Sequence, residues 1–223
     1  PINGILGMVE IAESHPADIE KLRDCRHKIH EAANMLLAMV NDILDMNKLE
    51  SGRLEPESVP FDILELLTEV NHLAGIQAPA YGVTTHVKNP PFPVRRVIGS
   101  PTFLRRVLLN LAGNALKYNR RGGRIDFSCD KIEIKGDTAY FTLTCADTGI
   151  GMSEDFQKRA FEPFTQESNT ARTRYMGTGL GLAIVKELVE KMDGTIALES
   201  QEGVGSRFSL TVPFTIDHAP QEE

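Results

Sequence analysis

The chain has 223 residues, of which 41% are hydrophobic and 25% charged, and its formal net charge at pH 7 is −7. This is the composition of a folded globular protein, and the length allows one large domain or two smaller ones. The negative charge argues against a nucleic-acid partner, because phosphate backbones are bound by basic surfaces. Three cysteines are too few for a disulfide framework or a zinc site and fit reduced thiols in a cytosolic compartment, and no apolar run is long enough for a membrane span.

The first fifty residues have the pattern of a helical hairpin. Residues 1–14 are amphipathic but begin without a helix cap, which is typical of a sequence cut inside a helix and taken from a longer chain. A turn is predicted at 14–18, and apolar residues then keep heptad register over 19–50. The apolar stripe is wide, which favours a four-helix bundle made by two chains over one long helix packed on its own domain. Residues 1–52 are therefore expected to be a dimerisation hairpin.

Helices and strands alternate after Gly52. Ser100-Pro101 is the strongest boundary signal, because an N-cap serine is followed by proline in the first helical turn. The predicted elements of this part are a strand over 54–58, a helix from Asp62 to about Pro79, a strand over 83–87 and a helix from Ser100 to about Tyr118.

The second half is richer in strands. Two β-like runs flank a turn at 135–137, and an amphipathic helix near the end is followed by Gly194, which suits a helix C-cap. The expected elements are strands over 124–134, 139–146, 195–199 and 207–213, a short helix after Ser153 and a helix over 180–192. This pattern predicts an α+β fold over residues 53–215, with helices layered on a mixed, mostly antiparallel sheet, and a polar tail over 216–223.

Two glycine-rich segments about thirty residues apart carry the strongest chemical signal. The first is Asp147-Thr148-Gly149-Ile150-Gly151, in which a carboxylate beside glycines can bind the edge of a flat polar ring. The second is Gly177-Thr178-Gly179-Leu180-Gly181, which opens an apolar helix and can present bare amides to phosphates. One segment suits a base and the other a phosphate chain, so the pair predicts a nucleotide site.

Further polar residues fit the same ligand. Asn110, Asn114 and Lys117 are four and three residues apart, so they share one helix face. Hydrated Mg²⁺ and phosphate oxygens would satisfy these side chains, although a solvated helix edge would also have this pattern. The polar stretch 167–176, which carries Arg172 and Arg174, is either a lid over the phosphates or an ordinary surface loop.

The order of these motifs resembles that of the sensor histidine kinases, over nearly the whole chain. Phe161-Glu162-Pro163-Phe164 and Gly203-Val204-Gly205-Ser206-Arg207-Phe208 are similar to further motifs of that family. Pro1-Ile2-Asn3-Gly4-Ile5-Leu6-Gly7 resembles the segment after its phosphoacceptor histidine. The resemblance implies a dimeric four-helix bundle followed by the Bergerat-type α/β sandwich that is shared with gyrase, the ninety-kilodalton heat-shock chaperone and the mismatch-repair ATPases.

The resemblance also implies roles for individual positions in binding ATP and Mg²⁺. The carboxylate of Asp147 would accept a hydrogen bond from the adenine amino group, and Asn114, with Asn110 nearby, would hold the metal. Lys117 would contact phosphate and Tyr118 the nucleoside. The remaining nucleotide-binding positions implied in this way are Gly149, Gly151, Phe164, Arg172, Arg174, Gly177, Thr178, Gly179, Leu180 and Gly181.

Asn110 distinguishes among relatives. Hydrolytic members of the superfamily carry a glutamate at this position to activate water, and an amide cannot act as a base. Asn110 therefore favours phosphoryl transfer to a protein over a chaperone- or topoisomerase-type ATPase. A non-catalytic ATP-sensing module is the alternative from another class, and the complete motif set argues against it.

The acceptor of such a transfer is not expected within the sequence. The family's acceptor motif is His-Glu-x-x-(Thr/Asn)-Pro, and Pro1 matches only its last letter. His30-Glu31 imitates the motif, but Met35 stands where proline should be. The chain is expected to bind ATP without phosphorylating itself. The resemblance implies a homodimer, a response-regulator receiver aspartate as the final acceptor, no membrane contact by this portion, and a parent anchored in the inner membrane with this part in the cytoplasm.

Two other matches to known motifs are coincidental. Asp147-Thr148-Gly149 spells an aspartic-protease signature, but no second copy supplies the partner carboxylate. The segment 177–181 is spaced Gly-x-Gly-x-Gly near the C-terminus and lacks the following βαβ unit of a dinucleotide-binding fold.

Overall fold

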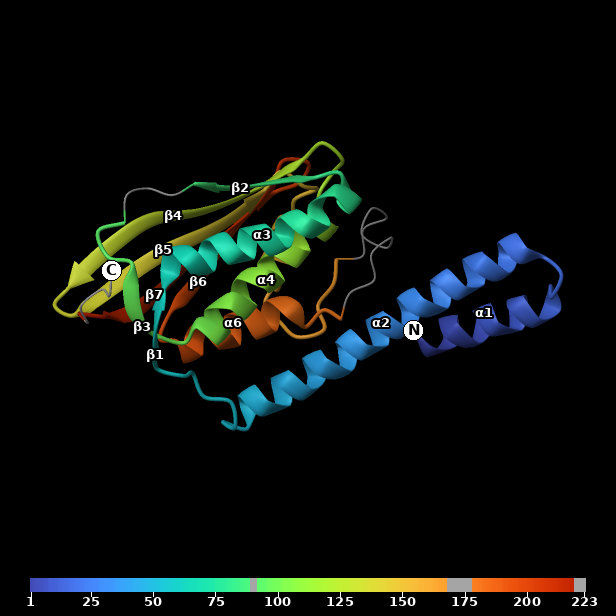
Figure 1. Cartoon of the computed structure of the whole chain (residues 1–223), viewed down its shortest axis with the longest axis horizontal. Coiled ribbons are helices and arrows are strands. Elements are labelled where there is room, and N and C mark those ends of the chain that lie inside the picture. Colours follow the sequence, from blue (N-terminus) through green and yellow to red (C-terminus); the bar gives the residue numbers. More distant parts are fainter. Residues whose placement is uncertain (89–91, 168–177, 219–223) are drawn as a thin grey trace. The chain divides into compact units, whose positions relative to one another are not determined.

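The computed structural model describes residues 1–88, 92–167 and 178–218 (Figure 1). The chain divides into two compact units, Pro1–Glu50 and Ser51–Glu223. Among the described residues, no helix combines the length and the apolarity that crossing a membrane requires.

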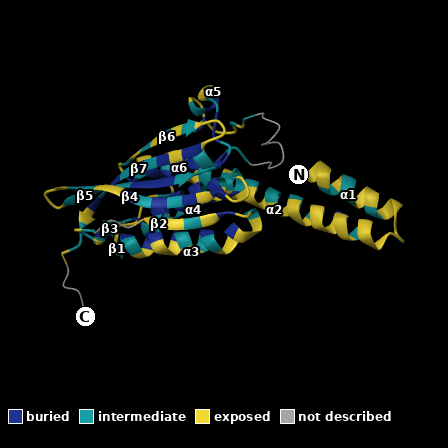
Figure 2. Ribbon diagram, turned by 90° about the horizontal axis from the view of Figure 1, so that it is seen from above, coloured by how far each residue is buried: buried dark blue, intermediate teal, exposed yellow. Residues whose placement is uncertain are grey.

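The first unit is the expected helical hairpin. Helix α1 (Ile2–Ser14) packs on helix α2 (Ile19–Glu50), and the carboxylate of Asp18 begins α2 by accepting a hydrogen bond of 3.0 Å from the Lys21 amide. No residue of α1 is buried, and both helices are largely exposed in Figure 2. The large apolar side chains that stay exposed on the hairpin are Ile2, Leu6, Val9, Ile11, Ile19, Leu37, Val40, Ile43 and Leu44.

The second unit contains one sheet of seven strands among its described residues. Its strand order is β1-β3-β7-β5-β4-β2, and β6 pairs with β7 beside this path. Among the strand pairs of the described residues, only β2–β4 is parallel, so the prediction of a mixed, mostly antiparallel sheet in an α+β fold is confirmed. The strands are β1 (Val59–Asp62), β2 (Thr84–Lys88), β3 (Arg96–Gly99), β4 (Arg124–Lys135), β5 (Thr138–Asp147), β6 (Thr195–Gln201) and β7 (Gly205–Ile216).

Three helices cover one face of this sheet (Figure 1). They are α3 (Ile63–Tyr81), α4 (Pro101–Lys117) and α6 (Gly181–Lys191), and the short helix α5 (Glu154–Gln157) lies beside β6. Alternate residues of the long strands are buried under the helices, as expected for a sheet with one covered face (Figure 2). Phe127 and Phe141 from the sheet and Leu104, Leu108 and Leu111 from α4 are fully buried. The core therefore holds α4 against the sheet.

The sequence predictions were wrong at the sheet edge. Residues 54–58 are not a strand; the edge strand β1 begins at Val59 and pairs with β3, which was not predicted. Pro56 has no amide hydrogen to donate to a ladder, whereas Phe61 in β1 packs edge-on against Phe214 with ring centroids 5.3 Å apart. Tertiary packing therefore decides where this strand forms.

Two predicted elements also end earlier than the observed ones. Helix α3 passes Pro79 and ends at Tyr81, where Gly82 forms a left-handed cap (φ +67°). Strand β7 continues to Ile216, into the segment predicted as polar tail, because the Ile216 amide donates to the Asp137 carbonyl at 2.7 Å. The neighbouring Asp217 accepts from Arg96 Nε at 3.1 Å, which adds a side-chain contact at this end.

The loop before β1 contributes a cap to α4. The side chain of Ser100 accepts a hydrogen bond of 3.3 Å from the Phe103 amide, as its sequence position predicts. The Glu57 carboxylate accepts another, of 2.9 Å, from the Thr102 amide. Hydrogen bonds from Thr102 hold the pKa of Glu57 below its ordinary value. The carboxylate therefore stabilises the fold when it is ionised.

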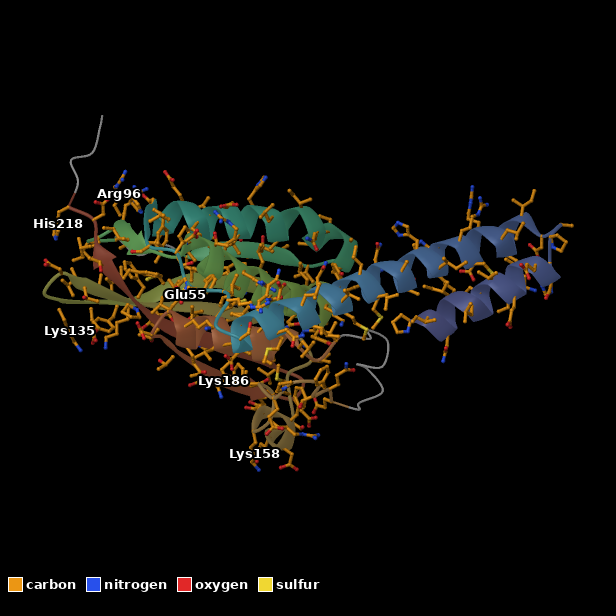
Figure 3. All side chains as sticks on the ribbon, turned by 90° about the horizontal axis from the view of Figure 1, so that it is seen from below. Glu55, Arg96, Lys135, Lys158, Lys186 and His218 are labelled. Carbon is orange, nitrogen blue, oxygen red and sulfur yellow. The ribbon has the colours of Figure 1, made fainter. Side chains whose placement is uncertain are left out.

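A Glu57→Gln variant is expected to lose about 0.3–1 kcal/mol of unfolding free energy at pH 7, the usual effect of a carboxylate at a helix N-terminus. The lowered pKa means that this contribution is complete above the ordinary pKa of glutamate and disappears as the pH falls through the lower, folded-state pKa. Urea unfolding at pH 7 and pH 3 measures both values. Glu55→Gln, at the exposed neighbour labelled in Figure 3, is the control. An equal loss in both variants, or at both pH values, would contradict the assignment.

Candidate nucleotide-binding site

The last two turns of α4 present the predicted polar face. Asn110, Asn114 and Lys117 are each half-buried on this helix. Within the described part of the chain, the side chains of Asn110 and Asn114 make no hydrogen bond, and Lys117 Nζ lies 5.0 Å from the centroid of the Tyr118 ring. Two amide groups that are partly withdrawn from water without a protein partner are available to a ligand.

The start of α6 borders this polar face. Gly181 is the first residue of α6, and a Cβ atom added there would lie 4.0 Å from Oδ1 of Asn110. The structure therefore brings together two motifs that are about seventy residues apart in the sequence.

Residues 147–151, which we call the Asp147 loop, begin at the last residue of β5 and are hydrogen-bonded to the end of α4. Asp147 is half-buried, and its Oδ1 accepts a hydrogen bond of 2.8 Å from the Gly149 amide. The Ile150 amide donates to the carbonyl of Tyr118, the C-cap residue of α4, at 3.0 Å. The predicted base-binding loop and the predicted phosphate-binding helix are thus joined directly through the backbone.

The glycines of this loop are required by the protein's own backbone. A Cβ atom on Gly149 would overlap the carbonyl oxygen of Tyr118, and one on Gly151 (φ +67°) would overlap that of Gln201. Gly205, at the start of β7, is packed equally closely against the carbonyl oxygen of Asp147. These close approaches hold the Asp147 loop between α4 and the β6–β7 turn.

The second glycine segment is described from Thr178 onward. The Thr178 hydroxyl accepts a hydrogen bond of 3.1 Å from the Leu180 amide, and Leu180 is buried at the N-cap of α6. This N-cap makes no side-chain hydrogen bond, so the first amides of α6 can meet an anion. Three predicted site residues, Arg172, Arg174 and Gly177, lie outside the described residues.

Phe164 lies against this segment through its backbone. Its amide donates to the Gly179 carbonyl at 3.0 Å, and a Cβ atom on Gly179 (φ +71°) would lie 2.9 Å from the Phe164 Cα. Phe164 has a positive φ of 62°, uncommon for a bulky residue, and its side chain is 68% exposed. The structure therefore places Phe164 at the edge of the predicted phosphate-binding segment.

The thiol and histidine groups do not supply a nucleophile or a metal cluster here. Burial, together with the Asp147 carboxylate, raises the pKa of Cys145, and burial raises the pKa of Cys129 to about 11, so both stay protonated at neutral pH. The described residues contain no group of three or more His, Cys, Asp or Glu side chains suited to a metal. His30 lies on exposed α2 with its Nδ1 3.0 Å from Asn34 Nδ2.

Sequence reasoning gave no role to Asn119 and none to the side chain of Thr148. Both lie in this site, where the Thr148 hydroxyl donates to Asn119 Oδ1 at 3.4 Å and accepts from the Arg124 amide at 2.9 Å. The pair Gly122-Gly123 beside them could have indicated a close approach, because consecutive glycines often mark backbone crowding.

Known proteins resemble the chain in both units. The family model of the histidine kinase-, DNA gyrase B- and HSP90-like ATPases matches residues 99–216, and that of the His Kinase A (phospho-acceptor) domain matches residues 1–52. Hybrid signal transduction histidine kinase A of Dictyostelium discoideum is 36% identical over 222 residues, which is 97% of this chain and 10% of the relative. The histidine-protein kinase BarA of Escherichia coli is 36% identical over 211 residues, which is 93% of this chain and 22% of the relative.

A solved structure shows the same likeness. Full-length ShkA in complex with AMPPNP superposes with a TM-score of 0.72 at 32% identity, over 99% of this chain and 44% of that one. The chain thus spans only about a tenth to a fifth of the curated relatives named above. By its match over residues 99–216, more than half of its length, the chain belongs to the histidine kinase-, DNA gyrase B- and HSP90-like ATPase family.

Proposed function

We propose that this chain is the dimerisation and catalytic core of a protein that binds Mg-ATP and transfers the γ-phosphoryl group to a histidine. The observation that carries the proposal is the convergence of three motifs. The Asp147 loop is bonded to the end of α4, and the Asn110 side chain borders the uncapped start of α6. One site would then carry groups suited to a base, a metal ion and a phosphate chain.

Asp147 is the proposed adenine contact. The hydrogen bond from the Gly149 amide orients its carboxylate, and a half-buried carboxylate is a strong acceptor for the amino group of adenine. Tyr118, at the junction of α4 and this loop, is the proposed nucleoside contact.

Asn110, Asn114 and Lys117 are proposed to meet the metal and the phosphates. Amide oxygens are suitable Mg²⁺ ligands, and Mg²⁺ commonly takes few protein ligands and completes its shell with phosphate oxygens and water. The side-chain amides of Asn110 and Asn114, which make no hydrogen bond to the described residues, fit this role, and the bound ion would neutralise charge on the transferred phosphoryl group. The α6 amides after Thr178, Gly179 and Leu180 would hold phosphate oxygens. Arg172, Arg174 and Gly177 stay predicted phosphate contacts.

Transfer rather than hydrolysis is favoured by the side chain at position 110. Asn110 can donate and accept hydrogen bonds, but it cannot take a proton from water, so the site lacks the base that a hydrolase uses there. Phosphoryl transfer needs mainly positioning and charge neutralisation, which this site can supply.

The hairpin is proposed to form a homodimer. Leu37, Val40 and Leu44 are at least 46% exposed along α2, and a four-helix bundle of two chains would cover such an apolar stripe. We propose further that the phosphoryl group passes to an aspartate on a response-regulator receiver, that this portion is cytoplasmic because ATP is supplied there, and that the parent is anchored in a membrane.

The proposal is tested by comparing the chain alone with the chain extended at its amino end by the acceptor helix of its parent protein. With labelled Mg-ATP, we expect acid-labile, base-stable phosphohistidine only in the extended form. Asn114→Ala in the extended form should lower the rate by roughly a hundredfold or more, because it removes a ligand that acts on the transferred group. Asn47→Ala, which removes an exposed amide on α2, is the control.

Three outcomes would contradict the proposal. One is stable labelling of a histidine in the chain alone, and another is steady release of inorganic phosphate without labelling of the extended form. The third is an equal rate in the Asn114→Ala variant and the unchanged protein.

A further inference from the structure

A closed set of hydrogen bonds joins the end of α4, the start of β4 and the Asp147 loop. The Arg124 amide donates to Thr148 Oγ1 at 2.9 Å, and the Thr148 amide donates to the Arg124 carbonyl at 3.1 Å. Asn119 completes the set: its Nδ2 donates to the same carbonyl at 3.2 Å, and its Oδ1 accepts from the Thr148 hydroxyl at 3.4 Å. We call Asn119, Thr148 and the Arg124 backbone the loop bridge.

The side chain of Asn119 has little freedom within the loop bridge. Its Oδ1 also accepts a hydrogen bond of 3.0 Å from the Arg120 amide. A Cβ atom on Gly123 would overlap Oδ1, so this glycine leaves the space that the Asn119 side chain occupies. Hydrogen bonds from three segments and a close backbone approach therefore determine one rotamer.

The loop bridge acts on the residue next to Asp147. Thr148 is fixed to Asn119 and Arg124, and Ile150 is fixed to the Tyr118 carbonyl, so the loop is held on both sides of Gly149. Gly149 in turn supplies the amide that orients the Asp147 carboxylate. Through Thr148 and Ile150 the loop is bonded to residues 119 and 118, which directly follow the helix that carries Asn114 and Lys117.

We propose that Asn119 and Thr148 are positioning residues that set the Asp147 carboxylate at a fixed place relative to Asn114 and Lys117. One nucleotide would then have its adenine and its phosphates recognised in a single geometry, and small displacements of such groups are costly. This inference rests on the proposed function, because it takes Asp147 to be the adenine contact.

The test compares the affinities for ATP and ITP, measured by isothermal titration with Mg²⁺ present. ITP has a carbonyl where ATP has the amino group. The ATP:ITP affinity ratio therefore measures how well the Asp147 carboxylate is oriented toward that amino group. Thr148→Val keeps the side-chain shape but removes the hydroxyl, and we expect it to lower this ratio by about three- to tenfold, the effect of weakening one hydrogen bond. Thr148→Ser keeps the hydroxyl and should retain the ratio.

Asn119→Ala should lower the ratio to a similar extent. Because Asn119 and Thr148 act through one network, the double variant should be little worse than either single variant. Thr142→Val is the matched control, since it deletes a hydroxyl of β5 whose only hydrogen-bond partner among the described residues is the Thr211 hydroxyl, at 3.1 Å, away from the site. A variant that merely reduced the folded fraction would weaken ATP and ITP binding equally and leave the ratio unchanged.

The outcomes separate this inference from the proposed function. A protein of unchanged sequence that bound ATP and ITP equally would overturn the adenine role of Asp147, and with it the inference. Preference for ATP in that protein and an undiminished preference in both Thr148→Val and Asn119→Ala would overturn the inference alone.

Discussion

Asp147→Asn is expected to weaken ATP binding by about 1.5–3 kcal/mol, which corresponds to roughly a ten- to hundredfold rise in Kd. The amide is nearly isosteric, so its oxygen can still accept from the Gly149 amide at 2.8 Å. Its NH₂ group would instead face the amino group of adenine, which places two donors together and removes the negative charge. Isothermal titration with Mg-ATP measures the change.

The loss should be confined to recognition of the base. Competition by inorganic tripolyphosphate, which has no base, should be nearly unchanged, because the α4 face and the start of α6 are untouched. Asp155→Asn is the control, since Asp155 is an exposed carboxylate that pairs with Lys158 at 3.0 Å in α5. Undiminished ATP affinity in the Asp147→Asn variant would show that the carboxylate is structural.

Gly151→Ala should be the most destabilising of the substitutions considered, at about 3 kcal/mol or more of unfolding free energy. Gly151 has a φ of +67°, which penalises a side chain, and its added methyl would overlap the Gln201 carbonyl oxygen. To relieve this overlap, the β6–β7 turn would have to move away from the Asp147 loop. Urea unfolding should show the loss, and ATP affinity should fall in the fraction that remains folded.

The Gly203→Ala variant separates the penalty of a positive φ from the penalty of steric overlap. Gly203 lies in the same β6–β7 turn with a φ of +76°, but a Cβ atom there would meet nothing within 4 Å. It should therefore show only the conformational penalty, about 1–2 kcal/mol. If Gly151→Ala and Gly203→Ala lost the same unfolding free energy, the overlap with the Gln201 carbonyl would make no contribution to the loss.

The long elements of the fold could be predicted because local signals and tertiary packing agree there. Ser100 caps α4 as its position before Pro101 indicates, and buried residues alternate with more accessible ones over residues 124–129 of β4 and 138–143 of β5. Strands β1 and β3 could not be placed, because they are only four residues each and depend on contacts such as that between Phe61 and Phe214.

One feature of the candidate site, the shared helix face, could be predicted from residue spacing alone. Asn110, Asn114 and Lys117 share a face in the structure because helical spacing requires it. Sequence reasoning explained Gly149 and Gly151 by the space a ligand needs, whereas in the structure backbone carbonyls occupy the positions where Cβ atoms would be. Asn119 was missed because the Thr148 hydroxyl, which donates to its side chain, is 29 residues away in the sequence and is brought close only by folding.

The register between β5 and β7 also determines where an added label can be placed. Asp147 pairs with Ser206 at one end of this ladder, and Thr138 pairs with Thr215 at the other. Nine residues of extended strand separate the ends by about 30 Å. His218, which contacts Asp137 at 3.4 Å, lies at the far end with Arg96 and Lys135 (Figure 3). A fluorophore attached at position 218 would therefore lie far from the Asp147 loop and would not obstruct it.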